Sequence, residues 1–253
     1  MKIVGSIQAR LGSTRLPGKV LKPVAGVPLL LRHARRLRRS RLLDEIVVAT
    51  TTNPADDAIV DACRKEGLAF YRGSENDVLG RVSGLVRESG ADIHAEFYGD
   101  SPLTDAHLID ETIGVLLKGW DRLDFVSNSL KTTYPPGQEV LCYRASSLIE
   151  ADALVPKTDP LREHCGLHLV RRPERFRQLG LEAPDHYRAP DLYLEVDTAE
   201  DFEVVSAVFE HFLALGQEYF SLAQILDFFR GRPELSARNR GVERRWKPFR
   251  KDA

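Results

Sequence analysis

Short strand-like runs alternate with helix-like segments along the first 130 residues of the chain. The strand-like runs cover residues 2–7, 45–50, 68–71, 92–98 and 124–127. Helical periodicity covers residues 28–41, 55–66, 76–89 and 105–118. Strands that alternate with helices of about a dozen residues imply crossover connections and a largely parallel sheet. The pattern therefore predicts an α/β fold.

The regular alternation of strand-like and helix-like segments ends after residue 127. Extended segments are predicted at residues 139–143, 175–179 and 193–196, and helical segments at residues 145–153, 161–171, 199–212 and 222–230. From residue 230 to the end, the chain has nine Lys and Arg residues and three Asp and Glu residues. We predict one domain over residues 1–253, with an insertion at about residues 130–180. Residues 231–253 form a basic tail, either mobile or folded over a neighbour.

Composition excludes several classes of protein. Lys and Arg total 36 and Asp and Glu total 37, a formal net charge of −1, whereas nucleic-acid and membrane-surface proteins carry a basic excess. The three cysteines are far apart and form no CxxC pair, which predicts reduced thiols. The first residues do not resemble a signal peptide, and no apolar stretch approaches the roughly 20 residues of a membrane span. We expect a cytoplasmic protein without nucleic-acid or membrane partners.

The most informative segment is QARLGSTRLPGKVL, residues 8–21, which follows the first strand. It contains three cations, Arg10, Arg15 and Lys19, among glycines and Ser13. Glycines let the backbone approach a polyanion and direct N–H groups at it, and three cations can neutralise a triphosphate. The segment is neither GxxxxGK[ST] nor GxGxxG. It predicts a phosphate-binding loop, with a plain basic surface loop as the alternative.

The segment also resembles the signature of the cytidylyltransferases that activate acidic sugars. These include the 3-deoxy-manno-octulosonate and acylneuraminate cytidylyltransferases, and the similarity is strongest to the spore-coat polysaccharide biosynthesis protein F group. The motifs LLDEIVVATT, ENDVLGR, YGDSPLTD, REHCGLHLVRRPERF and LEVDTAEDFEVV follow in the expected order. The resemblance implies a mixed, mainly parallel sheet between helices. It also implies nucleotide binding by Gln8, Ala9, Arg10, Leu11, Gly12, Ser13, Arg15, Lys19, Arg81 and Asp100.

Two aspartates stand at predicted strand ends. Asp100 follows residues 92–98, and Asp197 follows residues 193–196. Ligands of open α/β sheets bind at the carboxyl ends of strands, and Mg²⁺ takes one or two carboxylates with phosphate oxygens and water. By resemblance, Asp100 and Asp197 hold the catalytic Mg²⁺. The alternatives are a turn before Pro102 for Asp100 and a helix cap for Asp197. Asp201 is expected to be part of that cap, and Asp105 to cap the helical segment that follows it.

The middle segments are expected to bind the two substrates. Arg81 in ENDVLGR either contacts the cytosine or a phosphate, or lies on a solvated face of a helix capped by Ser74 or Asn76. The resemblance places an acceptor pocket and a homodimer contact in residues 130–180. Acceptor-side candidates are Gln138, Glu139, Arg162, Glu163 and His164. Leu141 stands where a second acidic residue is common in the family, which leaves the acceptor open.

Two further clusters have ordinary interpretations. His164 and His168 would share one face of a helix, but HCGLH lacks the glutamate of HExxH, so zinc is not expected. RHARRLRRSR, residues 32–41, has six arginines without interleaved aromatic residues. An amphipathic helix whose basic face meets solvent or nearby acids is favoured over nucleic-acid contact.

The resemblance and the residues together predict nucleotidyl transfer. A sugar hydroxyl would attack the α-phosphorus of CTP and displace pyrophosphate, with Lys19, Arg10 and Asp100 as catalytic residues and Mg²⁺ as cofactor. A glycosyltransferase of the same fold is one alternative, but the chain lacks an Asp-x-Asp motif. A non-catalytic homologue is the other, although the chain retains the cations and both aspartates.

Overall fold

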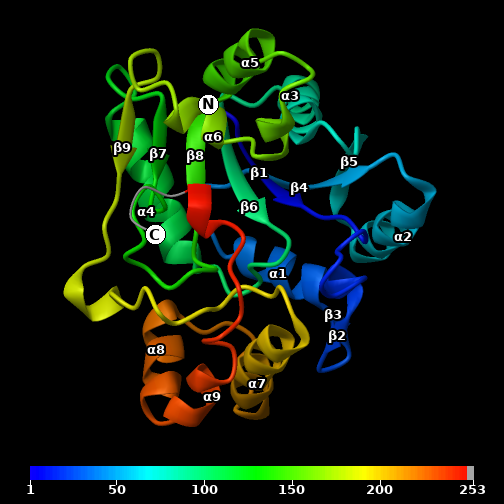
Figure 1. Cartoon of the computed structure of the whole chain (residues 1–253), viewed down its shortest axis with the longest axis vertical. Helices are drawn as coiled ribbons and strands as arrows, with labels where there is room; N and C mark the ends of the chain where they lie inside the picture. The colour runs from blue at the N-terminus through cyan, green and yellow to red at the C-terminus, as the bar shows by residue number, and fades with distance from the viewer. Residues whose placement is uncertain (250–253) are drawn as a thin grey trace.

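A seven-stranded sheet forms the centre of the protein, whose structure is a computed structural model that describes residues 1–249 (Figure 1). The strand order is β5-β4-β1-β6-β8-β7-β9. The first four strands along the chain that enter this sheet are mutually parallel: β1 (Ile3–Gln8), β4 (Glu45–Thr51), β5 (Ala69–Gly73) and β6 (Ile93–Tyr98). Crossovers through helices connect them, as the alternating pattern predicts.

The remaining strands make the sheet mixed. β8 (Leu141–Arg144) runs antiparallel to both β6 and β7 (Phe125–Ser127), and β9 (Gln178–Gly180) pairs in parallel with β7. Residues 130–180, which we expected to form an insertion, therefore contribute two strands to the central sheet. A separate two-stranded ribbon, β2 (Pro23–Val24) with β3 (Val27–Pro28), follows the basic loop. The mixed, mainly parallel sheet between helices is confirmed.

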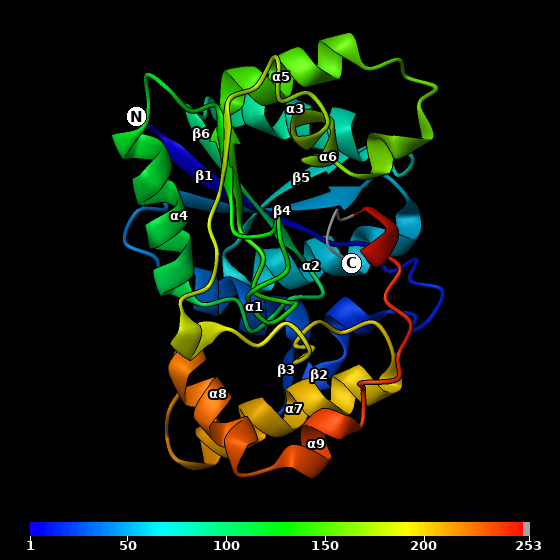
Figure 2. The same ribbon diagram turned by 60° about the vertical axis from the view of Figure 1, so that its left-hand side comes forward.

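Helices cover the two faces of the sheet in separate layers (Figure 2). One face packs against α1 (Leu29–Leu37), α2 (Asp57–Glu66) and α4 (Ala106–Lys118) in the larger core. The other face packs against α3 (Val78–Ser89), α5 (Ala145–Leu154) and α6 (Leu167–Val170). A further group packs beneath α1, formed by α7 (Ala199–Ala214), α8 (Leu222–Arg230) and α9 (Pro233–Ala237).

The sheet order reverses at β1, which lies between β4 and β6. Gln8, the last residue of β1, is paired with Tyr98, the last residue of β6. Immediately afterwards the Gly99 N–H donates to the Gln8 carbonyl at 2.9 Å, and a Cβ at Gly99 would lie 2.6 Å from that oxygen. Only glycine allows this approach. The carboxyl ends of β1 and β6 therefore meet at the crevice where open α/β sheets bind ligands.

Two predicted segments fold differently from expectation. Residues 193–196 are not a strand, because their backbone bonds to two loops: Leu194 N–H donates to the Pro136 carbonyl and Val196 N–H to the Asp100 carbonyl, both at 2.7 Å. The amphipathic segment 161–171 is divided into a 3₁₀ turn, Pro160–Glu163, and the short α6. His164 and His168 therefore do not share one continuous helix.

The arginine-rich helix α1 is also more buried than an amphipathic surface helix. Arg35 pairs with Glu66 as expected, but Arg32 and Arg36 are buried. Arg36 is 2% exposed, donates to the carbonyls of Leu103 and Phe220, and burial lowers its pKa to about 10. Through these two hydrogen bonds, Arg36 connects α1 to the loop after β6 and to the segment between α7 and α8. All three cysteines are buried and free, and within residues 1–249 no helix is long and apolar enough to cross a membrane.

Candidate active site

The basic loop is held against the sheet by a carboxylate from the β4 side. Leu11 N–H donates to Asp56 Oδ1 at 2.8 Å, and Thr51 at the end of β4 donates to the other oxygen of Asp56. Within the loop, the backbone amides of Ser13 and Gly18 both donate to the Leu11 carbonyl, at 2.8 and 3.1 Å. These bonds fold the loop back on itself at the carboxyl end of β1.

Lys19 lies where the two predicted metal ligands converge. Its Nζ is 2.9 Å from Asp100 Oδ2, 3.1 Å from Asp197 Oδ1 and 2.7 Å from the Val196 carbonyl oxygen. Burial opposes the charge on Lys19, but the two aspartates outweigh it and raise its pKa. The ammonium group of Lys19 thus connects the basic loop to the segment after β6 and to the segment before α7.

The other two loop cations are placed differently. Arg15 contacts the second oxygen of Asp197 at 2.7 Å and donates to the Glu243 carbonyl at 2.9 Å. Arg10 and Gly12 are exposed, and Ser13 is half-buried with its hydroxyl accepting from Leu16 N–H. The loop therefore keeps one exposed arginine beside a paired lysine and arginine.

The structure decides between the cap assignments. Thr198, not Asp197, is the N-cap of α7, and Asp201 completes a capping box with it, so Asp201 is part of the cap as predicted and the cap alternative for Asp197 is wrong. Asp105 caps α4 through His107 N–H at 2.7 Å, also as predicted. Asp77 caps α3 by accepting from Gly80 N–H, where we expected Ser74 or Asn76.

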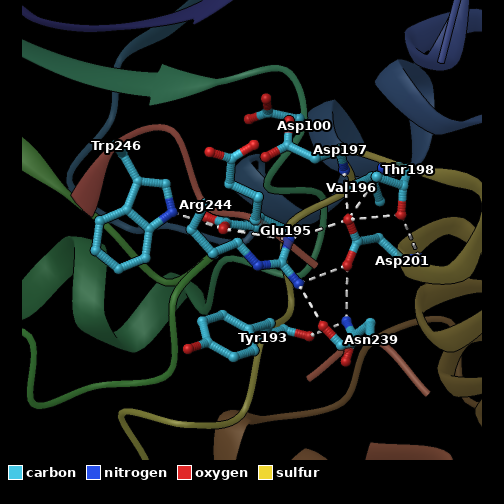
Figure 3. A network of polar contacts seen from close by, with 12 residues as sticks. Asp100, Tyr193, Glu195, Val196, Asp197, Thr198, Asp201, Asn239, Arg244 and Trp246 are labelled. Carbon is cyan, nitrogen blue, oxygen red and sulfur yellow. Dashed lines mark hydrogen bonds and ion pairs between the residues drawn. The ribbon is translucent and has the colours of Figure 1, made fainter. Parts of the chain in front are cut away.

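Glu195 was missed by sequence reasoning, although it lies within LEVDT. It is 6% exposed and accepts from Trp246 Nε1 at 2.6 Å (Figure 3). Burial and the neighbouring charge of Glu139 raise its pKa, against the opposing effect of Trp246 and Arg244. Glu139 itself is 8% exposed and accepts from Gly137 N–H at 2.8 Å. A second pair of acidic side chains therefore adjoins Asp100 and Asp197.

The C-terminal segment, residues 239–247, packs over this acidic group. Arg244 contacts both oxygens of Asp201, at 2.7 and 3.0 Å, and lies 3.5 Å from Glu195 (Figure 3). Asn239 Nδ2 donates to Asp201 at 2.8 Å, and the Arg244 guanidinium lies 4.3 Å from the centroid of the Tyr193 ring. This part of the basic tail packs on its own chain, while residues 250–253 lie outside the described residues.

Several predicted acceptor-side groups are used inside the protein. Gln138 is fully buried, and its side-chain amide accepts from Asp105 N–H and donates to the Leu103 carbonyl. Arg162 is 1% exposed and pairs with Asp77 and Asp152. Gln138 and Arg162, which we expected to contact the acceptor, are thus bonded to groups of the protein itself.

The other two members of the REH triplet remain at the surface. Glu163 and His164 are exposed, whereas His168 is buried and bonded to the Leu161 carbonyl. Among residues 1–249, no group of three or more His, Cys, Asp or Glu side chains is arranged to hold a metal ion. The donor set at Lys19 nevertheless fits Mg²⁺, because two carboxylate oxygens already converge on one cation and Mg²⁺ completes its shell with phosphate oxygens and water.

On the face of the sheet covered by α3 and α6, a polar group underlies the start of the loop. Gln8 Nε2 donates to Glu96, and burial raises the pKa of Glu96 to about 7 against the hydrogen bonds of Tyr143, Cys165 and Gln8. Arg81 on α3 is 4% exposed, and burial first and then the charge of Arg10 lower its pKa. Arg81 is thus close to the loop and not on a solvated face.

Comparison with known proteins decides the family. A family model described as cytidylyltransferase matches residues 4–227. The chain belongs to the cytidylyltransferase family. It is 33% identical to the spore coat polysaccharide biosynthesis protein SpsF of Bacillus subtilis (strain 168) over 208 residues, 81% of this chain and 85% of that protein. The expected resemblance is confirmed.

Two solved structures share the fold of this chain. A cytidylyltransferase from Leptospira borgpetersenii serovar Hardjo-bovis (strain JB197) is 28% identical with a TM-score of 0.87, covering 96% of this chain and 100% of that chain. A CMP:2-keto-3-deoxy-manno-octonic acid synthetase complexed with CTP shares the fold, with 18% identity, a TM-score of 0.62 and coverage of 83% and 99%.

Proposed function

We propose that this cytidylyltransferase transfers the cytidylyl group of CTP to an acidic sugar, for the synthesis of a surface polysaccharide or related glycan. The observation that carries the proposal is the convergence of Asp100 and Asp197 on Lys19, beside Arg15 of the same loop. The family, the name of the Bacillus subtilis relative and the CTP bound to a protein of the same fold support the nucleotide and the class of acceptor.

In the proposed mechanism, the protein accelerates the reaction mainly by positioning the two substrates and neutralising the charge of the triphosphate. An acceptor hydroxyl attacks the α-phosphorus of CTP, the bond to the bridging oxygen of the β-phosphate breaks, and pyrophosphate leaves. Lys19, Arg15 and Arg10 neutralise the triphosphate and then the departing pyrophosphate, and amides of the loop bind phosphate oxygens. Mg²⁺ held by Asp100 and Asp197 would supply further neutralisation and a lower pKa of the acceptor hydroxyl.

Release of pyrophosphate tests the proposal. The purified chain is incubated with Mg²⁺, each of CTP, UTP, GTP and ATP, and a panel of acidic sugars that includes an octulosonate and a nonulosonate. We expect pyrophosphate only with CTP and an acceptor, together with the CMP-sugar. Release of free nucleoside diphosphate from a nucleotide-sugar donor would instead identify a glycosyltransferase. If no nucleotide raises the melting temperature, the assignment of the loop fails.

A further inference from the structure

Glu96 lies at the centre of a buried polar chain beneath the nucleotide loop. It is 1% exposed, and one of its oxygens accepts from Gln8 Nε2 while the other accepts from the Tyr143 hydroxyl at 3.0 Å. Tyr143 is 2.8 Å from one ring nitrogen of His94, and the other ring nitrogen is 2.8 Å from the Ser6 hydroxyl. Alternation along β1 places Ser6 and Gln8 on the same face of the sheet, so both reach this chain.

This arrangement determines which way the Gln8 amide is turned. A glutamine amide has a donor end and an acceptor end, whereas an ionised carboxylate only accepts. While Glu96 is ionised, the NH₂ group of Gln8 must therefore face it, which turns Oε1 away from Glu96. Gln8 is half-buried, and within residues 1–249 its Oε1 accepts no hydrogen bond. An oriented acceptor without a partner thus stands at the carboxyl end of β1.

Hydrogen-bond donors lie near the same position. Arg81 is only 4% exposed. One of its terminal nitrogens donates to the Ser74 carbonyl, but its Nε has no hydrogen-bond partner in the described part of the chain. The charges of Arg10 and Glu96 both act on Arg81, and Glu96 is the hydrogen-bond partner of Gln8. A base bound between Gln8 and Arg81 would meet one acceptor, Gln8 Oε1, and guanidinium donors.

That combination matches cytosine better than uracil. Cytosine carries a 4-amino donor beside acceptors at N3 and O2, whereas uracil has an acceptor at O4 and a donor at N3. An amide oxygen directed at position 4 accepts from the amine of cytosine but repels the carbonyl oxygen of uracil. If the amide were turned over, its NH₂ group would reverse this preference.

We propose that Gln8 selects cytosine through its side-chain oxygen, and that Glu96 is the positioning residue that keeps this oxygen directed toward the base. The inference rests on the proposed function, since it concerns the base of the same nucleotide. Glu96 does not contact the nucleotide; it acts only through the orientation of the Gln8 amide.

Calorimetric dissociation constants for CTP and UTP test the proposal on the full chain. They are measured with Mg²⁺ at pH 8, where Glu96 is mainly ionised, for the unaltered protein, Gln8→Leu and Glu96→Gln. Gln8→Leu should lower the preference for CTP over UTP by about tenfold to a hundredfold. Glu96→Gln should lower it by roughly severalfold, because its amide allows Gln8 to turn over. Ser6→Ala is the matched control, since it alters the same buried chain without touching Gln8, and it should leave the preference unchanged.

The ratio of the two dissociation constants distinguishes a change in the orientation of the Gln8 amide from general damage to the fold, because such damage weakens the binding of both nucleotides alike. An unchanged ratio in Gln8→Leu overturns the proposal and leaves cytidylyl transfer standing. Equal binding of CTP and UTP by the unaltered protein also overturns it. If the unaltered protein binds no nucleotide at all, the proposed function fails and this inference fails with it.

Discussion

Arg244→Met tests whether a buried ion pair fastens the C-terminal segment to the start of α7. The side chains of Arg244 and Asp201 are both 0% exposed and are joined by two contacts, at 2.7 and 3.0 Å. Methionine keeps much of the apolar stem that packs on the Tyr193 ring and removes the guanidinium. Asp201 then remains as a buried carboxylate without its cation.

The expected loss follows from what Asp201 retains. Removing one partner of a buried ion pair costs about 3–5 kcal/mol in the free energy of unfolding. Asp201 would still accept from Asn239 and from the backbone N–H groups of Asp197 and Thr198. We therefore expect the lower end, about 3 kcal/mol. With a slope of about 3 kcal/mol per molar urea, the unfolding midpoint should fall by about 1 M.

Urea denaturation followed by far-ultraviolet circular dichroism measures this change. Arg64→Met is the matched control, because Arg64 pairs with Asp61 at the surface, where the two side chains are 66% and 62% exposed. Exposed pairs of this kind contribute little, so its midpoint should not move measurably. A drop for Arg244→Met no larger than that of the control would refute the reasoning.

Four other predictions follow from the site. Asp100→Asn should lower turnover by at least roughly a hundredfold with an unchanged circular dichroism spectrum; turnover like that of the unaltered protein would sink the metal assignment. Lys19→Met should reduce turnover and leave Asp100 without a cation and Asp197 with Arg15 alone, so Mg²⁺ alone should raise its melting temperature more than that of the unaltered protein. Equal shifts would contradict this. Gly99→Ala forces a Cβ against the Gln8 carbonyl and should destabilise the fold by about 1–3 kcal/mol, measured by urea denaturation; a neutral effect would rule out the close approach. Burial and Glu139 raise the pKa of Glu195 to about 8, so the folded protein retains a proton that the unfolded chain releases near 4.5. Stability should therefore fall as pH rises from about 5 to about 8, and Glu195→Gln should flatten that slope in melting curves; the same slope in both proteins would count against it.

Local pattern was sufficient for most of the fold. The predicted segments for β1, β4, β6, α3 and α4 agree with the observed elements within a few residues, because periodicity reports which face is buried. Residues 193–196 were predicted wrongly as a strand. Their composition favours an extended backbone, but it does not say whether the hydrogen-bond partners belong to a strand or, as here, to loops at Pro136 and Asp100.

The sequence by itself determined the α/β class, the basic loop and the aspartates at two segment ends, since each depends on neighbours within a few residues. Only the tertiary structure brought Gln8 to Glu96, 88 residues away, and Arg244 to Asp201, 43 residues away. It also showed that Gln138 and Arg162 are buried and bonded to other groups of the chain. Ion pairs and buried hydrogen bonds depend on distances of a few ångströms between distant segments, and no local pattern of residues records those distances.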